Sequence, residues 1–149
     1  MKKAMLIICC ALGAIAFISA DKNTSSNSEM TIEGVWELQH QFLYENNIVK
    51  DTLMNLNGYR QVKIYTKGKV MWTRFNPADS NEWFGYGTYE VKDGKLEERL
   101  EYGSDAMNRA LDTVQVFRFD LDLGKDRYSQ IVMDSNGDPE SSENYKRIE

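Results

Sequence analysis

Histidine is the side chain best suited to proton transfer near neutral pH, and this chain of 149 residues has a single one, His40. His40 alternates with Trp36, Leu38 and Phe42, a spacing that places the four side chains on one face of a β-strand. There it would act as a general base or as a hydrogen-bond donor to a bound ligand. The alternative interpretation is a packed histidine near one end of a barrel. One histidine excludes a His-rich zinc or haem site, and we expect neither a metal nor a cofactor.

A second chemically informative residue is Glu98, which alternates with Leu96 and Leu100 and is therefore expected on the dry face of its strand. A carboxylate there needs a partner or must be protonated. The candidate partners are Arg118 and Arg74, which would form with Glu98 a polar spot that orients a ligand. The alternative is that residues 114–121 present the other face inward, with Phe117, Phe119 and Leu121 in the interior, because a shift of one residue reverses every face.

Aromatic residues at alternate strand positions would line either a cavity or the packed core. Trp72 and Tyr86 are the aromatic side chains that we expect to contact a ligand. The full set of predicted ligand contacts is His40, Trp72, Tyr86, Glu98 and Arg118.

Short segments of alternating apolar and polar residues predict a protein built almost entirely from β-strands. In the hairpin around Lys67-Gly68, the alternation predicts that Val62 and Ile64 lie opposite Val70 and Trp72. Glycines at 85 and 87 share one face of a strand and predict a bend or the close approach of a large side chain. The strands are expected at 31–44, 59–66, 69–75, 82–91, 95–102, 114–121, 127–133 and 143–148, and the pairing of 48–56 is left open.

One short helix is expected at 105–111, with Ser104 as its cap. About eight strands joined by short polar turns favour an all-β, up-and-down antiparallel barrel over a Greek-key sandwich. A barrel of eight strands has an interior that holds at most one small ligand.

The chain begins with a predicted signal peptide at 1–20, because Lys2 and Lys3 precede an apolar run that ends in small residues. A polar spacer is expected at 21–30 and the barrel domain at 31–149. The protein is therefore expected to be exported, either secreted or periplasmic. The alternative, a lipoprotein anchored through Cys9 or Cys10, is disfavoured because both cysteines lie inside the apolar run.

The net charge of −5 argues against two kinds of partner. An acidic chain without a basic stripe has no electrostatic attraction to nucleic acid or to an anionic membrane surface. After removal of the signal peptide we expect no membrane span.

The Gly34-Val35-Trp36 motif in the first strand, together with Arg147 in the last, resembles the pattern of the lipocalin and lipocalin-like (calycin) family. The succession at 87–96 is also similar, and the closest likeness is to lipocalin-like domains of uncharacterised exported bacterial proteins. The resemblance implies that Arg147 covers the indole of Trp36 and closes one end of the barrel. The chain departs from longer lipocalins in having no room for a helix after the last strand and no cysteine pair after the signal peptide.

These observations favour non-enzymatic binding of a small molecule, mostly apolar or amphipathic, inside the barrel. The alternative is a cell-envelope accessory protein with a filled barrel, in which an aromatic strand such as 82–91 binds a protein or a glycan. An enzyme is less favoured than either, because His40 is the one side chain suited to proton transfer at neutral pH.

Overall fold

The computed structural model describes residues 30–55 and 58–149. The predicted signal peptide, Cys9, Cys10 and nearly all of the spacer lie outside these residues. The described part forms nine strands and one helix, namely β1 (Gly34–Glu45), β2 (Ile48–Met54), β3 (Arg60–Thr66), β4 (Lys69–Phe75), β5 (Trp83–Lys92), β6 (Lys95–Gly103), α1 (Asp105–Leu111), β7 (Val116–Leu123), β8 (Arg127–Met133) and β9 (Pro139–Arg147). No helix within it has the length and apolarity needed to cross a membrane.

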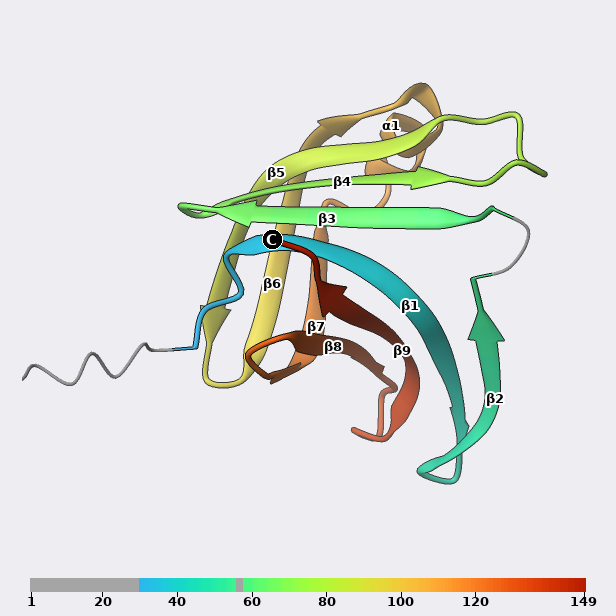
Figure 1. The fold of residues 1–149 in the computed structure, drawn as a ribbon, viewed down its shortest axis with the longest axis vertical. Coiled ribbons are helices and arrows are strands. Elements are labelled where there is room, and N and C mark those ends of the chain that lie inside the picture. The colour runs from blue at the N-terminus through green and yellow to red at the C-terminus, as the bar shows by residue number, and fades with distance from the viewer. Residues whose placement is uncertain (1–29, 56–57) are drawn as a thin grey trace, which may run out of the picture.

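Eight of the strands form a closed antiparallel ring (Figure 1). β1 pairs with β3, each strand from β3 to β9 pairs with the next, and β9 pairs with β1. This ring and the single short helix confirm the predicted all-β antiparallel barrel. β2 lies outside the ring and pairs only with the C-terminal half of β1, from His40 to Glu45. The segment whose pairing the sequence left open is therefore an extra edge strand.

Trp36 closes one end of the barrel. Its side chain is fully buried, and its Nε1 donates a hydrogen bond to the carbonyl oxygen of Ile32 at 2.7 Å. The ring of Tyr128 meets the indole edge-on, with the ring centroids 4.9 Å apart. The indole of Trp36, near the start of β1, is therefore part of the hydrophobic core.

Arg147 covers the outer side of that indole, with its guanidinium carbon 4.0 Å from the ring centroid of Trp36. A cation–π contact of this kind contributes about 0.5–2 kcal/mol. Gly34 leaves space for the guanidinium, because a Cβ at this position would lie 2.3 Å from Nη1 of Arg147 and its φ is +137°. The guanidinium also donates to the backbone carbonyls of Thr31, Glu33 and Lys125. The guanidinium of Arg147 thus lies against both the indole of Trp36 and the backbone of Gly34.

The helix α1 packs against β5 and β6 at the other end of the barrel (Figure 1). The hydroxyl of Ser104 caps it by accepting a hydrogen bond from the backbone N–H of Met107 at 3.3 Å. Met107 and Leu111 are buried in the hydrophobic core. The helix therefore has the bounds and the cap that the sequence predicts.

A β-bulge at Gln39 reverses the faces of β1. Leu38 lies opposite Tyr145 and His40 lies opposite Asn144, so Gln39 has no partner on β9. Tyr145 is buried and faces the interior, whereas its neighbour Asn144, and with it His40, faces outward. The expectation that His40 and Phe42 share the interior face with Trp36 and Leu38 is therefore wrong.

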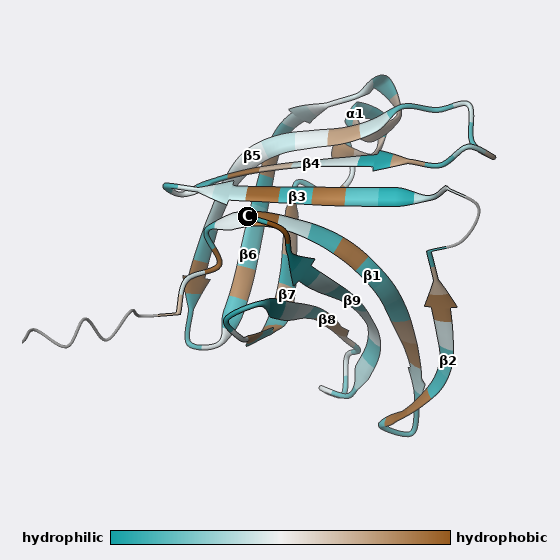
Figure 2. Ribbon diagram, viewed as in Figure 1, coloured by the Kyte–Doolittle hydropathy of each residue, from teal (hydrophilic) through white to brown (hydrophobic). Residues whose placement is uncertain are grey.

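The strand β3 presents its polar residues to the interior. Gln61, Lys63 and Tyr65 are at most 4% exposed, whereas Ile64 is 39% exposed. Lys63 lies opposite Trp72, so the predicted pairing of the hairpin is wrong by one residue. Figure 2 shows the resulting alternation of hydrophilic and hydrophobic bands along β3.

Candidate ligand-binding site

A charged pair lies inside the barrel. The Nζ atom of Lys63 is 2.9 Å and 3.1 Å from the two carboxylate oxygens of Glu98, and it also donates to Oε1 of Gln130 at 2.9 Å. The hydroxyl of Tyr65 donates to the same carboxylate. Glu98 faces inward, as its alternation predicts, but its partner is Lys63 rather than Arg118 or Arg74. A buried ion pair is tolerated only when further hydrogen bonds satisfy both groups, as they do here.

A second carboxylate, Glu143, is held by neutral donors. Its Oε2 accepts hydrogen bonds from Gln61 at 3.2 Å, Gln130 at 2.9 Å and Tyr145 at 2.5 Å. Gln130 joins the two carboxylates, because its Oε1 accepts from Lys63 while its Nε2 donates to Glu143. We call the two carboxylates, Lys63 and the side chains that hydrogen-bond to these three groups the interior network. It consists of Gln61, Lys63, Tyr65, Glu98, Gln130, Glu143 and Tyr145.

The tyrosines of the interior are held in their neutral form. Burial raises the pKa of Tyr65, Tyr128 and Tyr145 well above 10.0, and the negative charges of Glu98 and Glu143 raise it further. A neutral phenol donates a hydrogen bond, which is what the carboxylates of the interior network accept.

A cavity of about 190 Å³ extends from the interior network to the helix α1. Its volume is smaller than the roughly 300–1,000 Å³ of most drug-sized ligand sites. It exceeds the roughly 150 Å³ of a protein cavity that binds benzene. The interior therefore has room for one small molecule with about one ring. The polar wall consists of Gln61, Lys63, Glu98, Gln130 and Glu143 from the interior network, together with Arg74. The apolar wall consists of Trp72, Leu100, Met107, Phe117 and Phe119.

Arg74 lies at this cavity on the inner side of β4. It is opposite Gln61 on β3 and opposite Trp83 on β5, and its guanidinium carbon is 5.8 Å from the ring of Trp72 and 5.1 Å from that of Trp83. The Nε of Arg74 is buried and has no hydrogen-bond partner, the one such side-chain atom in the described residues. A lone buried guanidinium donor calls for an explanation.

Of the five predicted ligand contacts, the structure brings Trp72 and Glu98 together at the cavity. His40 lies on the outer face of β1, where its ring packs 4.6 Å from that of Phe42. It is therefore separated from the interior network by the sheet.

The other two predicted contacts, Tyr86 and Arg118, lie on the outer surface. Tyr86 packs against Tyr102 with ring centroids 5.3 Å apart. The side chain of Arg118 is 70% exposed and pairs with Glu97 at 2.9 Å. Their predicted place inside the barrel is wrong because β5 and β7 present the opposite faces inward. Phe117, Phe119 and Leu121 pack on the core instead, which is the alternative that the sequence left open.

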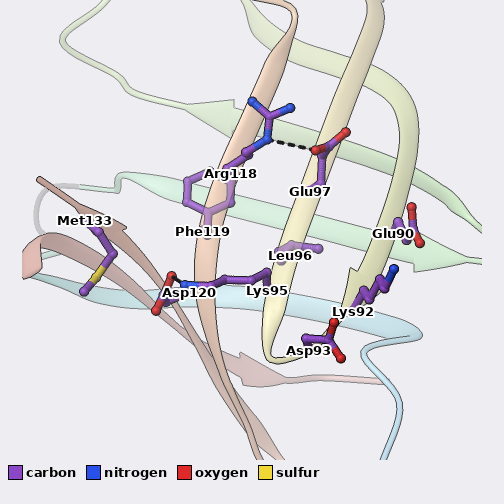
Figure 3. Close-up of a pocket in the computed structure, with 10 residues that line it drawn as sticks. All are labelled: Glu90, Lys92, Asp93, Lys95, Leu96, Glu97, Arg118, Phe119, Asp120 and Met133. Atoms are coloured by element: carbon purple, nitrogen blue, oxygen red, sulfur yellow. Dashed lines mark hydrogen bonds and ion pairs between the residues drawn. The ribbon is translucent and has the colours of Figure 1, made fainter. Parts of the chain in front are cut away.

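Arg118 instead lines a groove of about 590 Å³ near the turn between β5 and β6 (Figure 3). Charged side chains border this groove, and several neutralise one another. Arg118 pairs with Glu97, and Lys95 pairs with Asp120 at 2.5 Å. These two pairs leave Glu90, Lys92 and Asp93 as the charged residues of the groove that form no ion pair within the described part of the chain.

Sequence reasoning missed most of the polar wall, including Gln61, Lys63, Gln130 and Glu143. One signal was present, since an interior Glu98 requires a cation, and Lys63 lies on a strand of the same sheet. Within residues 30–55 and 58–149, no three His, Cys, Asp or Glu side chains are grouped so that they could hold a metal ion.

The closed eight-strand ring with its indole covered by an arginine is a lipocalin-like barrel. No protein-family model matches the chain, and no curated protein matches its sequence. A lipocalin-like protein from Bacteroides uniformis has a similar crystal structure, with a TM-score of 0.55 and 12% identity over 78% of this chain and 97% of that one. An uncharacterised protein from Bacteroides eggerthii is similar with a TM-score of 0.51 and 14% identity over 78% of this chain and 98% of that one. At this identity the likeness establishes the fold alone.

Proposed function

We propose that the barrel binds one small amphipathic molecule in its interior cavity and catalyses no reaction. The observation that carries this proposal is the cavity itself, which has room for about one ring and combines a polar wall with an apolar wall. Ligand sites are typically concave and lined by apolar groups with a few convergent polar ones.

The composition of the lining favours an amphipathic ligand over a wholly apolar one. Six of its eleven residues carry polar or charged side chains, and five are apolar. A wholly apolar molecule would leave the buried Nε of Arg74 without an acceptor, and an unsatisfied buried group costs about 1–3 kcal/mol.

Binding without catalysis is supported by the separation of the groups that transfer protons. His40 faces outward from β1, whereas Glu98 and Glu143 are already engaged by donors inside the barrel. The proposal places this binding outside the cytoplasm, in the periplasm or the medium, because residues 1–20 have the three parts of a signal peptide.

Native mass spectrometry of the protein purified from its own host tests the proposal. We expect a stoichiometric adduct of low mass that is released on denaturation. The variant Leu100→Phe fills the cavity wall and should lose this adduct, while Ile64→Phe makes a similar change on the outer surface and should retain it. Equal adduct levels in the two variants would show that the molecule binds elsewhere.

A second candidate function, contact with a protein or glycan partner, is favoured by one observation on the outer surface. Ile64, Met71, Tyr86 and Tyr102 lie directly opposite one another across β3, β4, β5 and β6 and form an outward-facing row. Three of them are between 39% and 54% exposed. A double variant, Met71→Lys with Tyr102→Lys, should abolish co-sedimentation with host envelope fractions if this row is the contact, whereas Leu100→Phe should not.

A further inference from the structure

We propose that the ligand of the interior cavity carries an anionic group, which pairs with the guanidinium of Arg74. This inference rests on the proposed binding function and specifies its ligand class. The class is a small carboxylate whose apolar body is of about the size of one ring.

The position of Arg74 makes it the cation that a ligand would meet. Its side chain lines the cavity, and the rings of Trp72 and Trp83 lie within 6 Å of its guanidinium carbon. Such contacts hold the planar group in place and leave its N–H donors free for a bidentate acceptor. None of the ion pairs formed by the described residues includes Arg74, and its buried Nε has no acceptor.

The neighbouring charged groups already have hydrogen-bond partners. The ammonium of Lys63 uses its hydrogens on Glu98 and Gln130, and Glu143 accepts three hydrogen bonds. Near the turn that precedes β5, the carboxylate of Asp79 accepts from Nε1 of Trp83 at 2.8 Å. Arg74 is thus the charged residue of the cavity lining that forms neither a hydrogen bond nor an ion pair with the described residues, and this favours an anionic group over a cationic one.

The apolar wall determines the size and the apolar character of the rest of the ligand. Trp72, Leu100, Met107 and Phe117 line the cavity together with Arg74. A flat or short aliphatic body fits about 190 Å³, while a long fatty acid exceeds it. A carboxylate matches the fork of an arginine with two parallel hydrogen bonds.

A charge series of probes of nearly equal size tests the inference, namely benzoate, benzamide and benzylamine. Their dissociation constants are measured by NMR titration of the full domain, with the backbone amides of β4 and β6 as reporters. We expect benzoate to bind about tenfold to a hundredfold more tightly than benzamide. This ratio of dissociation constants corresponds to the usual contribution of a hydrogen bond to a charged group. Benzylamine should bind most weakly.

The variant Arg74→Gln should remove the preference for benzoate and leave the affinity for benzamide within about threefold. The matched control is Arg118→Gln, which removes an arginine from the outer surface and should leave the preference unchanged. If Arg74→Gln does not fold, Arg74→Lys keeps the charge without the planar fork and should weaken benzoate selectively.

The outcomes separate the two proposals. Equal affinities for benzoate and benzamide, or an equal loss of both in Arg74→Gln, would overturn the anionic ligand while leaving the cavity a binding site. The absence of any shift from all three probes at millimolar concentration, in a domain that is folded by the same spectra, would overturn both.

Discussion

The ammonium nitrogen of Lys63 lies 2.9 Å and 3.1 Å from the two carboxylate oxygens of Glu98, and the two side chains are 5% and 3% exposed. They come from β3 and β6, two strands that do not pair with each other in the ring. The ion pair therefore ties together separate walls of the barrel through its interior.

Removal of one partner should destabilise the protein strongly. Lys63→Met leaves the carboxylate of Glu98 buried without its cation, and we expect a loss of about 3–5 kcal/mol in the free energy of unfolding. The double variant Lys63→Met with Glu98→Leu should recover most of this loss, because it removes both charges. Equilibrium denaturation in urea measures each value.

The matched control for that experiment is the exposed pair Lys95–Asp120. Lys95→Met should change the unfolding free energy by less than about 1 kcal/mol, because solvent screens exposed pairs. A loss at Lys63 no larger than that at Lys95 would contradict a structural role for the interior pair.

Trp36 and Arg147 should contribute unequally at the closed end. Trp36→Ala removes a fully buried indole and should cost about 3–5 kcal/mol. Arg147→Met keeps the apolar stem but removes the cation–π contact and the three hydrogen bonds to carbonyls, for which we expect about 1–3 kcal/mol. Thermal and urea unfolding give both values, and Arg127→Met, at an exposed position on β8, should lie within about 0.5 kcal/mol of the wild type.

The stability should fall steeply in alkaline solution. The pKa values of Tyr65, Tyr128 and Tyr145 are raised in the folded protein above the 10.0 of an exposed tyrosine. The unfolded chain therefore loses these protons first, so the stability is fully present below about pH 10 and is lost as the pH rises above it. Each tyrosine that stays protonated in the folded state lowers the stability by about 1.4 kcal/mol per pH unit there.

Ultraviolet absorbance of tyrosinate, followed beside circular dichroism, checks this prediction. The interior tyrosines Tyr65, Tyr128 and Tyr145 should ionise only together with unfolding. Ionisation of all eight tyrosines while the circular dichroism remains native would contradict the burial argument.

The fold was predictable because its determinants are local. Turn residues, strand alternation and the cap at Ser104 are each read from a few neighbours in sequence, and they predict the ring strands and the helix within a few residues. The strand β2 was left open because its residues are all exposed and show no alternation of burial.

The site was predictable only in part because its polar wall depends on long-range pairing. Alternation groups apolar residues together, so Ile64 was expected opposite Val70 or Trp72, whereas Ile64 is exposed and the buried Lys63 lies opposite Trp72. On β3 the polar residue lies inside instead, because Lys63 forms an ion pair with Glu98, which is 35 residues away in the sequence. No local pattern reports such a partner, although the inward position of Glu98 did predict that one exists.

The bulge at Gln39 provides the last prediction. Without it, Leu38 and Phe42 would occupy equivalent interior positions on β1, whereas the pairing with β9 places Leu38 inside and Phe42 on the outer face. Leu38 is 1% exposed, so Leu38→Ala should cost about 2–5 kcal/mol. Phe42→Ala should cost less than about 1.5 kcal/mol, because only part of its ring is covered, by neighbours such as His40 at 4.6 Å. Urea unfolding of the two variants side by side decides the matter, and equal losses would mean that β1 runs without a bulge and that His40 faces the interior.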